Sequence, residues 1–151
     1  MNDRLAALQA LIDRSTRTAT PSVAESLAFP GRQMGAAELV AFWREARMTA
    51  MATVGAAGQP HVAPVHAELD GPTLRLVVYA DAVRRADLRT NARVAFTTWK
   101  DGAAAILYGR AHEVPGSLRD ARPGRSVAPR QVVTIEIALT RVYAMRAPER
   151  S

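Results

Sequence analysis

The sequence predicts a mainly β protein in which six antiparallel strands form a small barrel. Most residues after 48 alternate between apolar and polar side chains with the two-residue period of a strand. Turns that contain glycine or proline break this alternation into short segments. Antiparallel strands in this number favour closure, because a closed barrel leaves no exposed edge. At 151 residues the chain fits a single domain with a well-formed core.

Helical spacing comes before the strands. Apolar side chains recur on one face of residues 3–13, and again within residues 36–46. The segment between them is rich in turn formers and has room for at most one short helix. We therefore expect residues 1–35 to form an N-terminal helix and connector, and residues 36–151 to form the barrel domain, within one domain overall.

The expected strands follow in order. Pro60 and Pro64 cannot donate hydrogen bonds to a ladder, so they place the second strand at an edge, a bulge or a barrel opening. The first three strands indicate an antiparallel meander. A short helix over residues 82–90, capped by Asp81, separates the third strand from the fourth. The strands are expected at residues 48–54, 61–69, 74–79, 92–99, 103–114 and 131–145.

Composition narrows the classes of function. The chain has no cysteine, which excludes disulfides, thiolate nucleophiles and thiolate metal sites. No apolar run approaches the roughly 20 residues that span a bilayer, and residues 1–15 lack a signal-peptide core. We therefore expect a cytoplasmic protein that does not enter a membrane. The net charge of +6, from 19 arginines and one lysine, suits anionic partners.

Positive charge is concentrated in the stretch "YADAVRRADLRTNARVAF", residues 79–96. Arg84 and Arg85 occupy the first turn of the expected helix, where the free amides already carry partial positive charge. Two cations at this end are unfavourable for the helix unless an anion binds there. Free amides and guanidinium groups together suit a phosphate. The alternative is that both arginines are solvated or pair with Asp81 and Asp87.

Four segments between Met48 and Val114 are similar to sequence motifs that occur in the same order in a known family. "MATVGAAGQPHVAPV" is similar to a hairpin of the form A-T-x-x-x-x-G-x-P-x-x-x-P-V, and "LDGPTLRLVVY" to the turn and strand that follow it. "AVRRADLRTNARVAF" is similar to S-x-K-x-x-N-L-x-x-N-P-x-V-A, and "LYGRAHEV" to G-x-A-x-x-V. Together they resemble the FMN-binding split-barrel family of pyridoxamine 5′-phosphate oxidase and its relatives that use FMN or the deazaflavin F420. The resemblance implies a six-stranded split β-barrel that forms a homodimer, with FMN at the subunit interface.

The resemblance also implies roles for individual residues. Arg84 matches a lysine that contacts the flavin phosphate, and arginine keeps that charge. Ala82 stands at the motif's serine and removes a hydroxyl donor, whereas Asp87 stands at its asparagine and adds negative charge near the anion. The implied cofactor-binding residues are Pro64, Val65 and His66 at the flavin ring, Val78, Tyr79 and Ala80 beside the ribityl chain and phosphate, Arg84 and Arg85 at the phosphate, and Thr98, Trp99 and Lys100 toward the partner subunit's cofactor.

The implied function is that of a flavin-dependent oxidoreductase with an unidentified small-molecule substrate. The cofactor would supply the redox chemistry, and the protein would position it. This fits a sequence without a recognisable catalytic constellation. Three alternatives stay open: F420 in place of FMN, a barrel that binds flavin or haem without turnover, and a basic interaction module with an empty pocket.

Metal and nucleic-acid sites are not expected. His61 and His66 are five residues apart on one strand and should face opposite sides, which argues against a shared metal ion. The loop at residues 115–130 is basic but has no aromatic side chain for base stacking, so we do not expect nucleic-acid binding. The arginines of this loop are Arg119, Arg122, Arg125 and Arg130.

Overall fold

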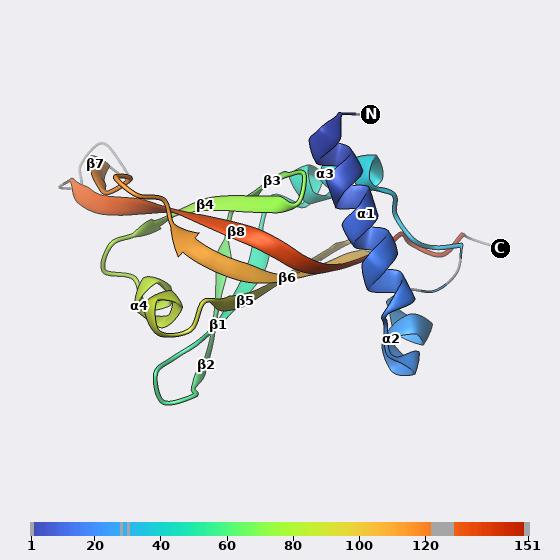
Figure 1. Ribbon diagram of the computed structural model, residues 1–151, viewed down its shortest axis with the longest axis horizontal. Coiled ribbons are helices and arrows are strands. Elements are labelled where there is room, and N and C mark those ends of the chain that lie inside the picture. Colours follow the sequence, from blue (N-terminus) through green and yellow to red (C-terminus); the bar gives the residue numbers. More distant parts are fainter. Residues whose placement is uncertain (1, 28, 30, 122–128, 150–151) are drawn as a thin grey trace.

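The protein folds as one antiparallel sheet with helices at its margins, and the computed structural model describes residues 2–27, 29, 31–121 and 129–149 (Figure 1). The helices are α1 (Asp3–Arg17), α2 (Pro21–Ser26), α3 (Ala36–Ala46) and α4 (Val83–Thr90). The strands are β1 (Thr49–Val54), β2 (Pro60–Val65), β3 (Glu68–Asp70), β4 (Thr73–Tyr79), β5 (Arg93–Lys100), β6 (Ala103–Glu113), β7 (Arg119–Ala121) and β8 (Arg130–Met145). The predicted mainly β fold, with N-terminal helices and a short helix before the strand at residue 93, is confirmed. None of the described helices has both the length and the apolar character that crossing a bilayer requires.

The strand order makes the sheet curl back on itself. The order is β2-β1-β5-β6-β8-β4-β3, with β7 beside β8, and every pairing is antiparallel. The two ends of this path, β2 and β3, are neighbours in the chain, joined through His66 and Ala67. The strands therefore enclose a common core. Its largest fully buried side chains include Met51, Leu74, Phe96, Leu107, Ile135 and Ile137.

Two local features give the sheet more strands than the six expected. The segment expected as one strand at residues 61–69 divides after Val65, so that β2 pairs with β1 whereas β3 pairs with β4. The antiparallel pairings expected for the first three strands are both present, although they are made by the two parts of the divided segment, and β1 takes β5 as its other neighbour. The short β7, from the basic loop, adds to β8. Pro60 and Pro64 lie in β2, at one end of the strand path, as expected for residues without an N–H donor.

Helix α1 is joined to the sheet and to α3 by hydrogen bonds. On α1, the Ser15 hydroxyl accepts a hydrogen bond from the backbone N–H of Val142 at 3.0 Å. The side-chain carbonyl of Gln9 accepts one from the backbone N–H of Ala36 at 2.7 Å and so satisfies a free amide at the start of α3. The N-terminal region thus packs on the barrel, while its separation from the barrel domain at residue 35 stays a prediction.

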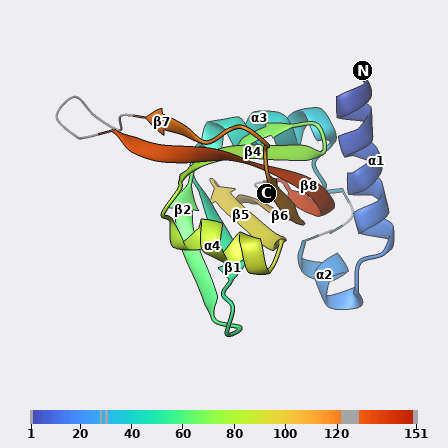
Figure 2. The ribbon, with the colours of Figure 1, turned by 60° about the vertical axis from the view of Figure 1, so that its left-hand side comes forward.

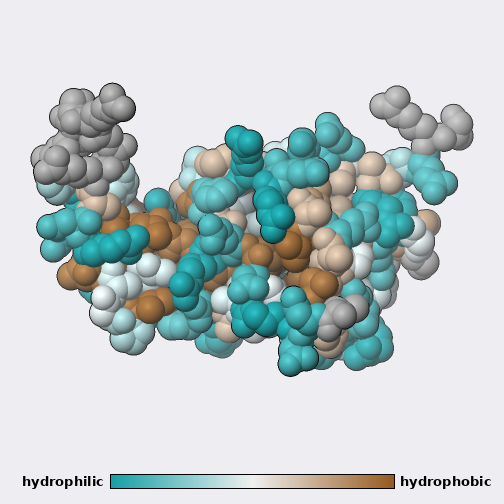
Figure 3. Space-filling model, turned by 90° about the horizontal axis from the view of Figure 1, so that it is seen from above, coloured by the Kyte–Doolittle hydropathy of each residue, from teal (hydrophilic) through white to brown (hydrophobic). Residues whose placement is uncertain are grey.

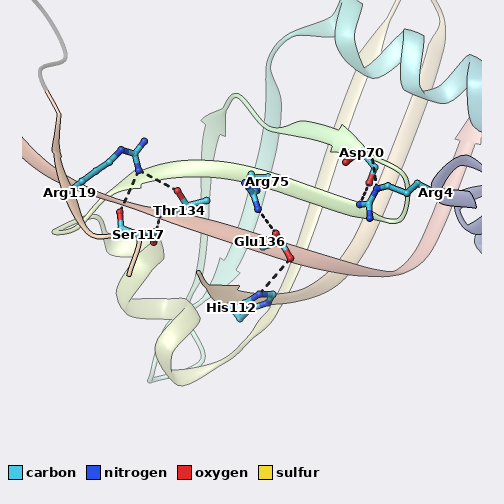
Figure 4. A network of polar contacts seen from close by, with 8 residues as sticks. All are labelled: Arg4, Asp70, Arg75, His112, Ser117, Arg119, Thr134 and Glu136. Atoms are coloured by element: carbon cyan, nitrogen blue, oxygen red, sulfur yellow. Dashed lines mark hydrogen bonds and ion pairs between the residues drawn. The ribbon is translucent and has the colours of Figure 1, made fainter. Parts of the chain in front are cut away.

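The outer face of β4, β6 and β8 carries polar contacts (Figure 4). Arg75 donates to Glu136 at 2.8 Å, and this hydrogen bond lowers the pKa of the Glu136 carboxyl. His112 lies 3.8 Å from the same carboxylate. Exposed pairs of this kind add little to stability, so they mark a solvated face.

Hydrophobic side chains form a band on the surface seen from above, and hydrophilic side chains flank and interrupt it (Figure 3).

A bulge in the β6–β8 ladder explains one of the motif glycines. The register shifts between Tyr108 and Gly109, where β8 has one residue more than β6. A Cβ atom on Gly109 would lie 2.5 Å from Ile137 Cγ2 and 2.6 Å from the carbonyl oxygen of Ala138. Because the second contact is with backbone, it cannot be relieved by a change of rotamer. Glycine is required here by the close approach of β8.

We expect Gly109→Ala to lower the free energy of unfolding by about 1–3 kcal/mol, because the added methyl group must displace β8. Urea unfolding followed by circular dichroism measures this. Gly35→Ala is the matched control, since its Cβ would meet only Gln9 Oε1 at an ordinary 3.4 Å. Equal stability of the two variants would contradict the packing explanation.

Candidate functional site

Helix α4 is anchored to the β1–β2 hairpin by one carboxylate. The helix follows β4 in the chain and contacts β1 (Figure 2). Asp87 is its buried residue, and Asp87 Oδ2 lies 2.7 Å from both Thr53 Oγ1 and His61 Nδ1. A carboxylate only accepts hydrogen bonds, so both neighbours donate. Thr53 and His61 are direct partners across the β1–β2 ladder, so Asp87 contacts both strands of the hairpin at once.

These donors keep Asp87 charged. The hydrogen bond from Thr53, followed by the contact with His61, holds the pKa of Asp87 below its usual value, although burial acts in the opposite direction. The residue is only 5% exposed, so its charge is directed at the hairpin. Among the described residues it forms no ion pair with an arginine. The negative charge that departs from the family motif is therefore stabilised by two hydrogen bonds within the protein.

The Arg85 side chain donates its hydrogen bonds to other groups of the protein. Its Nε donates to Glu113 Oε1 at 2.6 Å, and its Nη1 donates to the carbonyl oxygen of Ala80 at 2.9 Å. Arg89 approaches the same carboxylate at 3.3 Å. The hydrogen bond from Arg85 lowers the pKa of Glu113. These contacts fix the start of α4 to the end of β6 and leave Arg85 with less capacity for a ligand.

Arg84 differs from its neighbour. Its Nε atom is buried and has no hydrogen-bond partner among the described residues. A buried donor on a charged group is costly when it is unsatisfied, and an anion would satisfy it. The residue before the helix, Ala82, provides no side-chain cap, so the expected cap by Asp81 is wrong. Asp81 instead accepts a hydrogen bond from Arg130 at 2.7 Å.

Arg130 adds a further cation beside this helix terminus. Its guanidinium carbon lies 3.6 Å from the centre of the Tyr79 ring, a cation–π contact. The Asp81 carboxylate forms an ion pair with the same guanidinium. A hollow of about 230 Å³ opens here, lined by Ala80, Asp81, Arg130 and Gln131. The junction of β4 and α4 therefore holds a small depression bordered by the Asp81–Arg130 ion pair.

A larger and apolar hollow lies on the outer face of β1, β2 and β5. Its volume is about 360 Å³. Val62 and Trp99 at this hollow are 73% and 70% exposed. The ladder places Val62, Ala52, Ala95 and Tyr108 in one row across four strands, with two small residues between two large ones. The lining residues are Met48, Thr49, Ala50, Val62, Ala63, Pro64, Thr97, Thr98 and Trp99.

His66 belongs to a separate cleft beside α3. Its Nδ1 donates to the carbonyl oxygen of Arg47 at 2.8 Å. Arg47 has φ 63° and ψ −56°, and the N–H of Met48 donates to the carbonyl of Ala46 at 2.7 Å, which defines a strained γ-turn. His66 therefore stabilises the turn that leads from α3 into β1. The described residues contain no group of three or more histidine or acidic side chains that could hold a metal ion.

The structure divides the predicted cofactor-binding residues into separate groups. Pro64, Thr98 and Trp99 line the apolar hollow. Tyr79, Ala80, Arg84 and Arg85 lie at the junction of β4 and α4. Val65 and Val78 are core residues, so only their backbone can contact a ligand. His66 lies in the cleft beside α3, and Lys100 is exposed at the end of β5.

Three neighbours of this site were not predicted as part of it: His61, Glu113 and Arg130. Glu113 is 28 residues from Arg85 and His61 is 26 residues from Asp87, so the pairing of distant strands and helix brings them together. Arg130 was predicted only as a member of the basic loop. Two other arginines of that loop, Arg122 and Arg125, lie outside the described residues.

A family model described as pyridoxamine 5′-phosphate oxidase matches residues 36–146. The chain belongs to the pyridoxamine 5′-phosphate oxidase family. The four segments that carry the resemblance lie inside this match, so the predicted family is confirmed. No curated protein matches the chain.

Solved structures support the same fold. A conserved hypothetical protein from Mycobacterium tuberculosis has a TM-score of 0.63 at 21% identity, covering 82% of this chain and 94% of its own. An FAD-binding protein from Mesorhizobium loti has a TM-score of 0.59 at 20% identity, covering 78% and 98%. A protein named F420 reductase has a TM-score of 0.50 at 17% identity, covering 64% and 89%. At these identities the likeness concerns the fold.

The charged state of Asp87 gives a pH prediction. Because its pKa is lowered in the folded protein, its contribution to stability is present above the ordinary aspartate pKa and is lost as the pH falls through the folded value. We expect Asp87→Asn to be less stable than the wild type at pH 7 by an amount on the order of 1–3 kcal/mol, and the difference to narrow below about pH 4.

Urea unfolding at several pH values between 7 and 3 measures this difference. Asp81→Asn is the control, because Asp81 is exposed and bound to a surface arginine. A difference between Asp87→Asn and wild type that stays constant down to pH 3 would contradict the assignment.

Proposed function

We propose that this member of the family binds FMN and acts as an oxidoreductase on an unidentified small molecule. The flavin, when bound, supplies hydride or electron transfer. The residues of the chain bind and orient it. We also propose residues 36–151 as the cofactor-binding domain and the cytoplasm as its location. The observation that carries the proposal is the unsatisfied donor of Arg84 at the start of α4.

The surroundings of Arg84 fit the phosphate of FMN. Arg84 occupies the position of the lysine in the family motif, and its Nε is buried without a partner among the described residues. The carboxylates nearby are satisfied elsewhere, Asp87 by the hairpin and Glu113 by Arg85. An anion at this place would therefore meet a guanidinium and the amides of a helix terminus, with little repulsion.

The apolar hollow fits a flat ring that is shared between two subunits. Val62 and Trp99 are large, exposed and hydrophobic, which is typical of a surface covered by another molecule. We propose that a second copy of the chain packs here and that the flavin ring lies between the copies. Pro64, Thr98 and Trp99 would then contact the ring. The second subunit would cover the ring and exclude water from this contact.

An F420-dependent reductase is the second candidate. One structural relative is named an F420 reductase. Arg130 places an additional cation next to α4, which would suit a cofactor with further anionic groups beyond its first phosphate. Absorption spectra of the protein incubated with each cofactor distinguish the two, and a Soret band would indicate a haem-binding protein instead.

We expect Arg84→Ala to weaken FMN binding by about 1.5–3 kcal/mol, the range for a lost charge-assisted hydrogen bond. Titration of the apoprotein, followed by quenching of flavin fluorescence, gives the Kd. Arg89→Ala is the matched control, because Arg89 lies on the same helix, its side chain is 60% exposed, and its polar contact within the described part of the chain is with Glu113. Unchanged affinity in Arg84→Ala, or an equal loss in both variants, would remove Arg84 from the proposed site.

We expect the wild type to sediment as a dimer and Trp99→Glu to shift it toward the monomer, because a charge would be buried at the contact. Sedimentation velocity at several concentrations measures the distribution. Val77→Glu is the control, since Val77 is also exposed and apolar but lies on β4. A wild type that is monomeric at every concentration, or a Trp99→Glu variant as dimeric as the wild type, would contradict the proposed contact.

A further inference from the structure

His61 is held in one orientation and presents a free ring nitrogen. Its Nδ1 lies 2.7 Å from Asp87 Oδ2, and because a carboxylate only accepts, Nδ1 carries the proton. The side chain is 36% exposed, and among the described residues Nε2 has no hydrogen-bond partner. The buried carboxylate thus fixes the ring, while Nε2 is left for another group.

His61 approaches the side of α4 that carries Arg84. Residues three apart on a helix are neighbours on one face, so Arg84 and Asp87 lie one above the other. Asp87 contacts His61, which places the imidazole next to the turn of α4 that contains Arg84. Arg85 extends instead toward Glu113 on β6. Two donors with unsatisfied capacity, the Arg84 Nε and the His61 ring, therefore border the same side of the helix.

We propose that His61 is a second ligand of the phosphate that Arg84 binds, and that Asp87 is the positioning residue that holds the imidazole for this contact. The proposal rests on the proposed function. With Nδ1 bound to Asp87, Nε2 donates to a phosphate dianion when the ring carries two protons, or accepts from a singly protonated phosphate when it carries one. Either arrangement contains the same number of protons and forms one hydrogen bond.

This assignment accounts for the two departures from the family motif. Ala82 removes the hydroxyl donor at the helix terminus, and Asp87 brings a carboxylate in place of an amide. In the structure, that carboxylate orients a histidine from the facing strand, so the donor lost at Ala82 is replaced by one from His61. The carboxylate that would repel the anion instead supports one of its ligands.

Nuclear magnetic resonance on the wild-type protein tests the contact directly. Ring nitrogens of ¹⁵N-labelled protein are recorded with FMN and with riboflavin, which has the same ring but no phosphate, and His61→Gln identifies the His61 signal. We expect the Nε2 resonance of His61 to shift with FMN and to stay in place with riboflavin. A signal that FMN leaves unmoved at saturation would overturn the proposal.

Titration of variants gives the second measurement. We expect His61→Gln to bind FMN about ten- to a hundredfold more weakly, the effect of a lost contact to a charged group, and to bind riboflavin within threefold of the wild type. His112→Gln is the control, because His112 lies on the polar outer face beside Glu136. Equal loss for FMN and riboflavin would show a merely structural role and overturn the assignment.

These FMN-binding measurements also distinguish failure of the His61 proposal from failure of the proposed function. If FMN binds and depends on Arg84 but not on His61, the flavin site stands and His61 is not its ligand. If the wild type takes up no FMN, the proposed function fails and the role of His61 fails with it.

Discussion

The position of α4 depends on two carboxylates that clamp it to the barrel. Asp87 joins the helix to both strands of the β1–β2 hairpin, and Glu113 joins it to β6 through Arg85. Each carboxylate is bound within the protein by these contacts, and so does not compete with an anion for the start of α4. What is left over is one guanidinium donor, Arg84 Nε, buried without a partner in the described part of the chain. The capacity to bind an anion follows from this distribution of pairs more than from the total of positive charge.

The curled sheet gives its outer faces different chemistry. Across β1, β2, β5 and β6, small alanines lie between larger apolar side chains and leave a shallow hollow. Across β4, β6 and β8, ion pairs such as Arg75–Glu136 cover the surface. An apolar ring and a second subunit suit the first face and not the second. The hairpin that forms one wall of the hollow is also the one that Asp87 anchors.

Local patterns predicted the elements of this fold but not all their partners. Two-residue alternation located the strands and helical spacing located α1 and α3, because both depend on neighbours in the chain. The division of β2 from β3 and the pairing of β1 with β5 depend on how the sheet curls, which no local pattern specifies. Arg84 was predicted because a motif and a helix terminus coincide there. His61 and Glu113 were missed because their contacts join residues 26 and 28 positions apart.

A crystal structure of the protein grown with FMN tests the central claim most directly. A phosphate oxygen should lie within hydrogen-bond distance, about 3 Å, of the Arg84 guanidinium, with the start of α4 facing it. A structure in which the flavin phosphate lies away from α4, while the Arg84 Nε stays without any partner, would contradict it.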